Sequence, residues 1–413
     1  MSEYTTTLAR RRTHVLASSY RTFYRRPVDI AAAHGVWLTD HDGHTYLDCY
    51  NNVPVIGHSH PRIAEAVDRE LGRANTHTRY LSEPTVACAE QLLAHLPDTL
   101  DTMVFTNSGS EANDLALQVA RFVTGRRGII VTTNAYHGTT YLAQSVSPSL
   151  SGRRDTPGVA YVGVPGQDAA DPAAEFADRT RAAVAELNAA GLDVAALLVD
   201  TTLTSDGIVT DPAGLLGGAA EVVRAAGGLV IADEVQAGFG RTGTWWGFTR
   251  HGMTPDLVTL GKPMGNGVPV AALVGRTDIL DRYGARFRYF NTFAGSPAAA
   301  AAASAVLSVI EEDGLVEAAA ATGILVRDAL QAAADLLPGD NRVRGAGMMN
   351  GLDLAASPVD AADLAEDLRD HGVLVGTTGA DGQTVKVRPP LVFGEPEVAV
   401  FRDRLLDVAG AYR

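Results

Sequence analysis

The sequence predicts an α/β protein built around a mostly parallel sheet. In the middle of the chain, short apolar runs alternate with longer amphipathic segments, which is the pattern of strands joined by helices. Each apolar run has about four to eight residues and is bounded by glycine or polar residues, as buried strands are. In such sheets ligands bind at the carboxyl ends of the strands. Candidate functional residues should therefore follow the apolar runs.

The expected strands and helices can be read in chain order. The strand-forming runs are DTMVFTNSG, GIIVTTNA, VAALLVD, GGLVIADE and DLVTLGK. Helices are expected between them in SEANDLALQVARFV, PAAEFADRTRAAVAEL and LLGGAAEVVRAA. The Ala-rich stretch SPAAAAAASAVLSVI also favours a helix, because its residues have high helix propensity.

The two ends of the chain have a different pattern. GVWLTDHDGHTYLDCYNN has two alternating runs around Asp42-Gly43, which indicates a β-hairpin. After about residue 300 come a long helix, VRGAGMMNGLDLA, another helix and QTVKVRPPLVF, which together predict a smaller α+β unit. We expect the N-terminal hairpin region to pack with this unit. The domains would then be residues 59–299, a large domain, and residues 1–58 with 300–413, a small one.

Composition narrows the possible functions. The 413 residues carry a formal net charge of −14, which argues against nucleic acid or an anionic membrane as a partner. Only two cysteines occur, Cys49 and Cys88, so neither a disulfide framework nor a thiolate metal site is indicated, and a reducing cytoplasm is expected. The N-terminal segment has basic residues but no apolar run after them, and no apolar stretch is long enough for a transmembrane helix.

Two motifs that follow strands favour binding of a flat, phosphorylated ligand. In TNSGSEAND, Ser108, Gly109 and Ser110 lie where a helix should begin, and the free amides and dipole of a helix start favour a phosphate. Taken alone, these residues could be a simple helix cap. In NAYHG, Tyr136 could stack on a flat ring, or it could be an ordinary loop tyrosine.

Two further motifs supply an acid and an amine. Asp233 ends the run GGLVI, where a buried carboxylate needs a cationic or hydrogen-bonding partner; a protonated aromatic nitrogen would serve. In TLGKPMGNG, Lys262 follows an apolar strand and is enclosed by glycines and a proline. Desolvation there favours the neutral amine, which can form a Schiff base.

A phosphate cradle, a stacking ring, an acid and a lysine, each after a separate strand, are the contacts that pyridoxal phosphate requires. The chain here resembles the class III aminotransferase family, of the fold typified by aspartate aminotransferase. The resemblance runs from GVWLTDHDGHTYLDCYNN through GHSHP, TNSGSEAND, YHG, DEVQAGFGRTG and GKPMGNG to VKVRPPL. It implies a PLP-dependent transferase of fold type I, with a large domain containing a mostly parallel seven-stranded sheet and a smaller α+β domain.

The resemblance also implies roles for single residues. Asp233 matches the acid at the pyridine nitrogen, Lys262 the Schiff-base lysine and proton carrier, Val235 the aliphatic contact to the ring and Gln236 the contact to its phenolic oxygen. His137 and Glu234 match supporting groups beside the cofactor. Thr292, in YFNTFAGSP, matches a residue that reaches the phosphate of the neighbouring subunit's cofactor. A homodimer with active sites at its interface therefore follows from the resemblance.

Two reactions remain open. Arg388 matches the arginine that holds a substrate carboxylate in many class III transaminases, which suits its bidentate guanidinium. However, Asp200-Thr201 stands where many dual-substrate transaminases have a Glu-Pro pair that covers this arginine.

Other motifs, including CYNNVPVIGHSHP, THTRYL and YFNTFAG, are closely similar to class III phospho-lyases, which eliminate phosphate from phosphorylated amines. Arg79, and after it Arg288, are candidates for binding such a substrate's phosphate; either could instead form a structural ion pair. We favour elimination from a phosphorylated amine or amino sugar. Transamination is the alternative, and a non-catalytic binding protein on this fold is a remote one.

Overall fold

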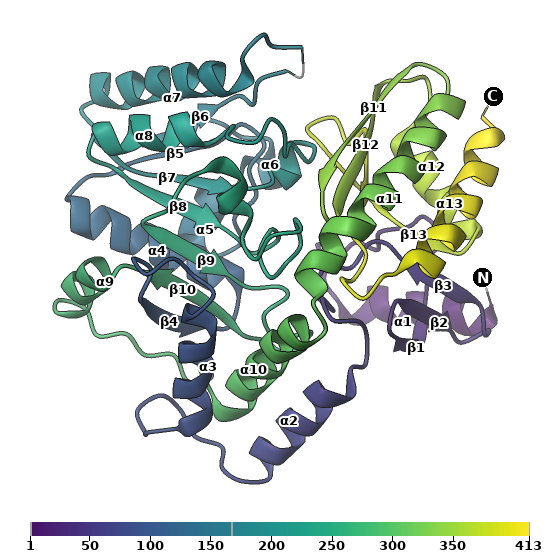
Figure 1. Cartoon of the computed structure of the whole chain (residues 1–413), viewed down its shortest axis with the longest axis horizontal. Coiled ribbons are helices and arrows are strands. Elements are labelled where there is room, and N and C mark those ends of the chain that lie inside the picture. The colour runs from purple at the N-terminus through teal and green to yellow at the C-terminus, as the bar shows by residue number, and fades with distance from the viewer. Residues whose placement is uncertain (1, 167, 413) are drawn as a thin grey trace.

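A seven-stranded sheet forms the centre of the molecule, which we describe from a computed structural model over residues 2–166 and 168–412. Its strand order is β4-β10-β9-β8-β7-β5-β6 (Figure 1). Strands β5 to β9 pair in parallel, and β10 runs antiparallel to β4 and β9, which confirms the predicted fold class. The strands are β4 Thr102–Thr106, β5 Gly128–Thr132, β6 Val159–Val162, β7 Val194–Asp200, β8 Leu229–Asp233, β9 Leu257–Leu260 and β10 Ala271–Gly275.

Both faces of this sheet are covered by helices, which explains its continuous apolar strands. Leu197 of β7 joins the core under α7 and α8, whereas its neighbour Leu198 joins the core under α4. Because alternate side chains of a strand point to opposite faces, a strand buried on both sides has no polar face. The covering helices and short turns are α4 Gly109–Thr124, α5 Tyr141–Ser145, α6 Pro148–Ser151, α7 Pro172–Ala189, α8 Gly217–Ala225, α9 Thr277–Gly284, η1 Thr204–Asp206 and η2 Gly247–His251.

The two ends of the chain meet in a pair of smaller sheets, with strand orders β1-β2-β3-β13 and β11-β12-β15-β14. The predicted hairpin around Asp42-Gly43 is formed by β2 and β3. In β13, Val373 pairs in parallel with Leu47 of β3, so the expected packing of the N-terminal hairpin with the C-terminal unit is confirmed. The domain division at residues 59 and 299 stays a prediction. The strands are β1 Ile30–His34, β2 Trp37–Asp40, β3 Thr45–Asp48, β11 Asp340–Ala346, β12 Met349–Ala356, β13 Val373–Leu374, β14 Gly376–Thr378 and β15 Thr384–Val387.

The remaining helices flank the two smaller sheets or lie below the central sheet in Figure 1. In this lower region, α10 packs against α2 and α3. They are α1 Glu3–Val15, α2 Pro61–Leu71, α3 Glu83–Leu93, α10 Pro297–Glu312, α11 Leu315–Leu336, α12 Ala361–Asp370 and α13 Glu395–Gly410. Within the described part of the chain, none of the helices combines the length and apolar character needed to cross a membrane.

Several elements were not anticipated from the sequence, among them β6, β10 and α1. Strand β6 is only VAYV, and β10 follows β9 without a helix between them, so the alternation of strand and helix does not reveal either. Helix α1 buries a single residue, Thr5, and therefore has no apolar stripe.

Close backbone packing between α11 and the β11–β12 turn gives a test of the fold. A methyl group added at Gly323 would lie 2.1 Å from the carbonyl oxygen of Gly347, whereas one added at Gly284, in α9, would meet no atom within 4 Å. Gly323→Ala should therefore lower the free energy of unfolding by about 1–3 kcal/mol. Gly284→Ala should leave it unchanged or raise it by up to about 1 kcal/mol. Urea denaturation of the two variants measures both effects; equal stabilities would contradict this packing.

Candidate active site

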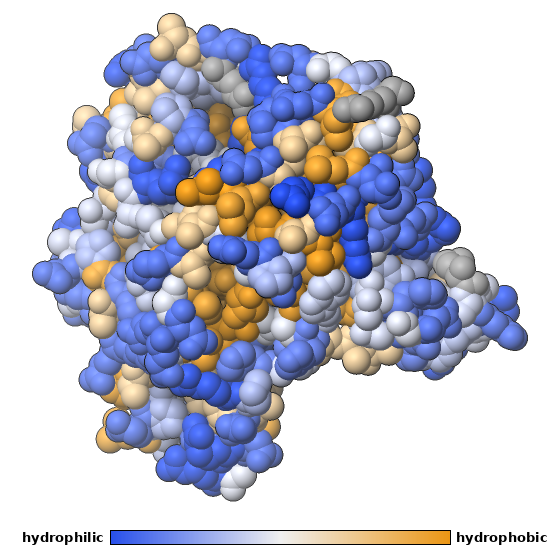
Figure 2. All heavy atoms as spheres, turned by 45° about the vertical axis from the view of Figure 1, so that its right-hand side comes forward, coloured by the Kyte–Doolittle hydropathy of each residue, from blue (hydrophilic) through white to orange (hydrophobic). Residues whose placement is uncertain are grey.

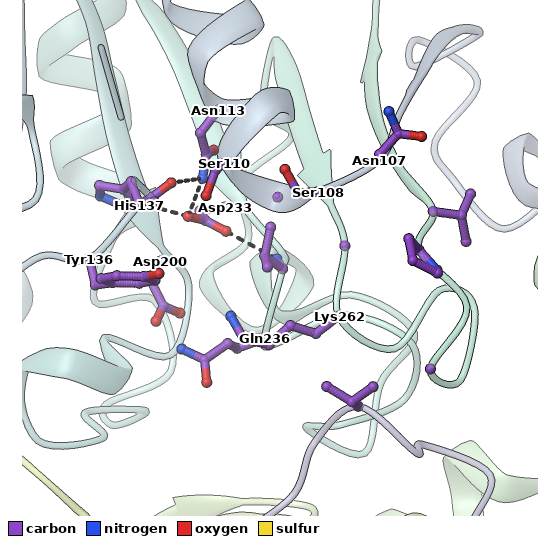
Figure 3. A pocket seen from close by; sticks show the side chains of 18 of the residues that line it. Asn107, Ser108, Ser110, Asn113, Tyr136, His137, Asp200, Asp233, Gln236 and Lys262 are labelled. Carbon is purple, nitrogen blue, oxygen red and sulfur yellow. Dashed lines mark hydrogen bonds and ion pairs between the residues drawn. The ribbon is translucent and has the colours of Figure 1, made fainter. Parts of the chain in front are cut away.

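The residues expected to bind a ligand surround one cavity of about 300 Å³ at the carboxyl ends of the central strands (Figure 3). Each enters from the segment after a different strand: the turn into α4 after β4, the loop after β5, and the ends of β7, β8 and β9. The predicted residues that line it are Ser108, Gly109, Ser110, Tyr136, His137, Asp233, Val235, Gln236 and Lys262. The topology thus brings together motifs spread over more than a third of the chain.

Asp233 is a buried acid of the cavity that is held by three neighbouring groups. It ends β8 and is only 4% exposed. Its Oδ2 accepts hydrogen bonds from Asn113 Nδ2 at 2.8 Å and pairs with His137 Nδ1 at 2.7 Å, and its Oδ1 accepts one from the backbone N–H of Val235 at 3.1 Å. These bonds compensate the desolvation of the carboxylate and fix its orientation toward the cavity.

The adjacent Glu234 faces away from the cavity and has a structural environment. Fully buried, it accepts hydrogen bonds from Thr201 Oγ1 and from the backbone N–H groups of Gly247 and Phe248. Burial raises the pKa of Glu234 to about 7, although these hydrogen bonds act in the opposite direction. The two neighbouring carboxylates at the end of β8 therefore serve opposite sides of the chain, one holding a loop and the other facing the cavity.

Asn113 was missed by the sequence analysis. It lies on α4, one turn after the glycine-containing start, and links three elements. Its Nδ2 also donates to the carbonyl oxygen of His137 at 2.9 Å, and its Oδ1 accepts a hydrogen bond from Thr259 Oγ1 at 2.7 Å. An asparagine buried on the inner face of a helix is the one signal that could have identified it, since such a polar group needs partners.

Lys262 lies in the turn that follows β9 and enters the cavity beside Tyr136. Its Nζ is 5.8 Å from the centre of the Tyr136 ring. Burial lowers the pKa of Lys262, and Arg388 acts in the same direction, while the charges of Asp233 and Asp200 oppose them. The neutral amine is therefore more accessible here than on an exposed lysine, as the sequence analysis expected.

The start of α4 approaches the rest of the cavity through glycines. Ser108 is the N-cap, and its Oγ accepts a hydrogen bond from the backbone N–H of Glu111 at 3.2 Å. A Cβ atom at Gly109 would lie 2.7 Å from the methyl groups of Val235, and one at Gly138 would lie 2.4 Å from Ser110 Oγ. Only glycine fits at either position, so the backbone amides of the helix start stay accessible to a ligand.

Gln236 connects the cavity to Arg388. Its Oε1 accepts hydrogen bonds from Arg388 Nη1 at 2.5 Å and from Asn52 Nδ2 at 3.2 Å. Arg388 is 5% exposed, its guanidinium lies 5.3 Å from the centre of the Tyr50 ring, and burial lowers its pKa to about 10. Arg388 thus stands behind Gln236, outside the lining of the cavity but one hydrogen bond away from it.

Asp200 is a second acid of the cavity and lies next to Asp233 in the register of β7 and β8. Its Oδ1 accepts hydrogen bonds from the backbone N–H and Oγ1 of Thr202, and its Oδ2 accepts one from the backbone N–H of Thr204 at 3.0 Å. In the sequence, this residue stands out only as a departure from the transaminase pattern. Its turn holds it in place.

Besides Arg388, three more predicted residues lie outside the cavity. Arg79 is exposed, with its guanidinium 3.7 Å from the centre of the Phe290 ring; Arg288 and Thr292 are exposed as well. Asn291, next to Thr292, accepts a hydrogen bond from Asn107 Nδ2 at 2.9 Å, so this segment adjoins the start of α4. The roles expected of Arg79, Arg288 and Thr292 stay predictions.

These features fit pyridoxal phosphate. A helix start with accessible amides suits its phosphate, a fixed carboxylate suits its pyridine nitrogen, and a lysine with a lowered pKa suits its aldehyde. Fold and site together define a pyridoxal-phosphate-dependent enzyme.

The chain belongs to the class III aminotransferase family, whose model (Aminotransferase class-III) matches residues 19–408. It is 34% identical to an alanine–glyoxylate aminotransferase 2-like protein of Drosophila melanogaster, over 96% of this chain and 85% of that one. It is 33% identical to ethanolamine-phosphate phospho-lyase homolog 1 of Caenorhabditis elegans, over 95% and 90%. A phospholyase from Arthrobacter, solved in complex with phosphoethanolamine, superposes with a TM-score of 0.93 at 38% identity, over 98% and 99% of the two chains.

The contacts of Asn113 lead to a testable prediction for cofactor affinity. Asn113→Ala removes a hydrogen bond to Asp233 and leaves the hydroxyl of Thr259 without its acceptor. We expect the dissociation constant of pyridoxal phosphate, titrated into cofactor-free protein, to rise roughly tenfold or more. Gln118→Ala is the matched control, because Gln118 is an exposed residue of the same helix that bonds only to surface groups. Equal affinities of the two variants would contradict the role of Asn113.

Proposed function

We propose that the protein eliminates phosphate from a phosphorylated primary amine. The observation that carries this proposal is the match, over nearly the whole of both chains, to the phospholyase solved with phosphoethanolamine. The environment of Arg388 supports it. In a dual-substrate transaminase a carboxylate must cover and release this arginine, but here Asp200 is held by its own turn and Arg388 by Gln236.

The residues of the cavity have separate roles in binding the cofactor. The amides of Gly109 and Ser110 at the start of α4 hold its phosphate, Tyr136 and Val235 flank its ring, and Gln236 contacts its phenolic oxygen. Asp233, kept in place by His137 and Asn113, keeps its ring nitrogen protonated. Bound there, pyridoxal phosphate supplies an electron sink for the carbon that bears the amine.

We propose that Lys262 has two roles. It bonds to the cofactor, and it moves the proton. Its lowered pKa leaves the amine neutral often enough to accept a proton from the amine-bearing carbon of the substrate. In the elimination that C–H bond and the C–O bond to phosphate on the adjacent carbon break, and phosphate leaves with the electron pair of the C–O bond. Water then releases ammonia and a carbonyl compound.

Transamination is the second candidate, favoured by one observation. Arg388 forms no ion pair with any carboxylate of the described residues, so its guanidinium is available to bind a substrate carboxylate. The aminotransferase relatives agree with this reading. The two reactions differ in whether a keto acid is needed.

We also propose that the protein works as a homodimer in the cytoplasm. Segments 77–81 and 289–293 adjoin through the His77 and Phe290 rings, 5.3 Å apart, and expose Leu81 fully and Phe293 to 72%. Figure 2, which is turned by 45° from the view of Figure 1, shows hydrophobic residues gathered in a band across the middle of the face in view. Exposed apolar surface of this kind marks interfaces. Both cysteines are free and buried, which fits a reducing compartment.

The reaction is tested by its products. The purified enzyme with pyridoxal phosphate should release inorganic phosphate and ammonia in equal amounts from phosphoethanolamine or a related amino phosphate, without any keto acid. Lys262→Ala should lower the rate by a factor of at least about 100, because it removes the proton carrier. Amino-group transfer that strictly requires a keto acid, with no phosphate release, would favour transamination instead.

The shared active site is tested by mixing two inactive variants. Thr292→Glu places a carboxylate against the phosphate of the partner subunit's cofactor, and Lys262→Ala removes the lysine. Each variant alone should be nearly inactive. After unfolding and refolding together, mixed dimers contain one site with both wild-type residues, so activity should return to about a quarter of the wild-type value. No recovery, with dimers present by sedimentation, would contradict a site built from two subunits.

A further inference from the structure

The distribution of lysine in the chain draws attention to a second amine. Of the 34 basic residues, 32 are arginine and only two are lysine, Lys262 and Lys386. All of the other basic residues in this count are arginine. Lysine differs from arginine in being a compact point charge whose pKa shifts readily on burial. One of the two lysines is the predicted Schiff-base residue, which raises the question of what the other does.

Lys386 lies on β15 and points to the same side of the sheet as Arg388, because residues two apart in a strand share a face. Its partners in the neighbouring strands are Gly351 of β12 and Gly376 of β14. Neither glycine has a side chain that could cover Lys386. The side chains of Tyr50 and Ile208 lie against these glycines instead, so other segments cover this part of the sheet beside Lys386.

This face of β15 is packed toward the loop after β7, whose first residue, Asp200, lines the cavity. Thr378 Oγ1 of β14 donates a hydrogen bond to the carbonyl oxygen of Thr204 at 2.7 Å. Gly207 lies against Thr384, the residue two before Lys386. Both contacts join the β14–β15 edge to the loop that begins at Asp200. Lys386 is thus placed between the loop after β7 and Arg388.

The charges around Lys386 are not balanced. No carboxylate among the described residues forms an ion pair with it. The acids that act on Lys386, Arg388 and Lys262 have other partners: Asp48 binds His58, Asp233 binds His137, and Asp200 is held by its own turn. Burial lowers the pKa of Lys386, and the positive charges of Arg388 and Lys262 lower it further, with only Asp200 acting against them. A buried group of cations with too few anions favours an anionic ligand.

We propose that Lys386 and Arg388 together hold the phosphate group of the substrate, an inference that rests on the proposed elimination from a phosphorylated amine. A phosphate dianion compensates two positive charges, which a substrate carboxylate cannot do. Arg388 supplies a planar pair of donors and Lys386 a point charge, a combination that suits the tetrahedral phosphate oxygens. Lys386 selects phosphorylated amines over amino acids.

The presence of only two lysines makes a direct experiment possible. In the holoenzyme labelled with ¹³Cε-lysine, Lys262 is bonded to the cofactor, so the remaining lysine signal belongs to Lys386. Inorganic phosphate is titrated into the holoenzyme, whose cofactor already fills its own phosphate site. We expect the Lys386 signal to shift as phosphate binds, and the pKa of Lys386 to rise, because a nearby anion stabilises the ammonium form.

Three variants accompany the titration. Lys386→Met removes the charge at similar size and should weaken phosphate binding to the holoenzyme by roughly 10- to 100-fold. Lys386→Arg keeps the charge and should bind within about threefold of wild type. Arg402→Met is the control for net charge, because Arg402 is exposed on α13, where it pairs with the exposed Asp403; this variant should bind phosphate as wild type does.

The outcomes separate this inference from the proposed function. A Lys386 signal that phosphate leaves unchanged, or a Lys386→Met variant that binds phosphate like wild type, overturns the phosphate site. If Lys386→Met does not fold, the titration of the wild-type signal and the Lys386→Arg variant decide the question. An enzyme that binds phosphate through Lys386 but releases none from any phosphorylated amine supports the phosphate site and refutes only the elimination reaction.

Discussion

A single carboxylate held at the end of a buried strand governs the arrangement of the whole site. Asp233 is nearly inaccessible to solvent, and its charge is stabilised by His137, Asn113 and the backbone of Val235. Its partners come from the loop after β5 and from α4, so three segments must be positioned correctly before the carboxylate is satisfied. Across the cavity stands Lys262, whose amine is made more basic by the charge of Asp233 and less basic by burial. A ligand that fits between them needs an electrophilic group that the amine of Lys262 can attack. It also needs a positively charged group beside the carboxylate of Asp233.

The second part of the site comes from the other end of the chain. Strand β15 belongs to a sheet of the C-terminal region, yet Arg388 reaches Gln236 of the loop after β8. In the proposed function, the central sheet therefore supplies the residues around the cofactor ring, and the smaller sheet supplies residues that bind the substrate. In the function proposed here, the acid and the lysine carry the chemistry, while the cations on β15 bind the anionic group of the substrate.

Much of this could be predicted from the sequence, for identifiable reasons. The strands β4, β5, β7, β8 and β9 are continuous apolar runs because both faces of the sheet are buried, and the residues that line the cavity lie at or shortly after their ends. Asn113 was missed because its role depends on which helix face meets β8, which no local motif reveals. Lys386 was missed because its surroundings are set by strand register and by glycines on two other strands. Arg79, which was predicted to bind the substrate phosphate, lies at the surface with its guanidinium over the ring of Phe290.

The most direct test of the central claim is to reduce the holoenzyme with borohydride and to map the labelled peptide by mass spectrometry. Because the chain has only two lysines, the result has few alternatives. The account predicts that the reduced cofactor is attached to Lys262 and that Lys386 is unmodified. Attachment to Lys386, or a holoenzyme that loses all of its cofactor after reduction, would contradict it.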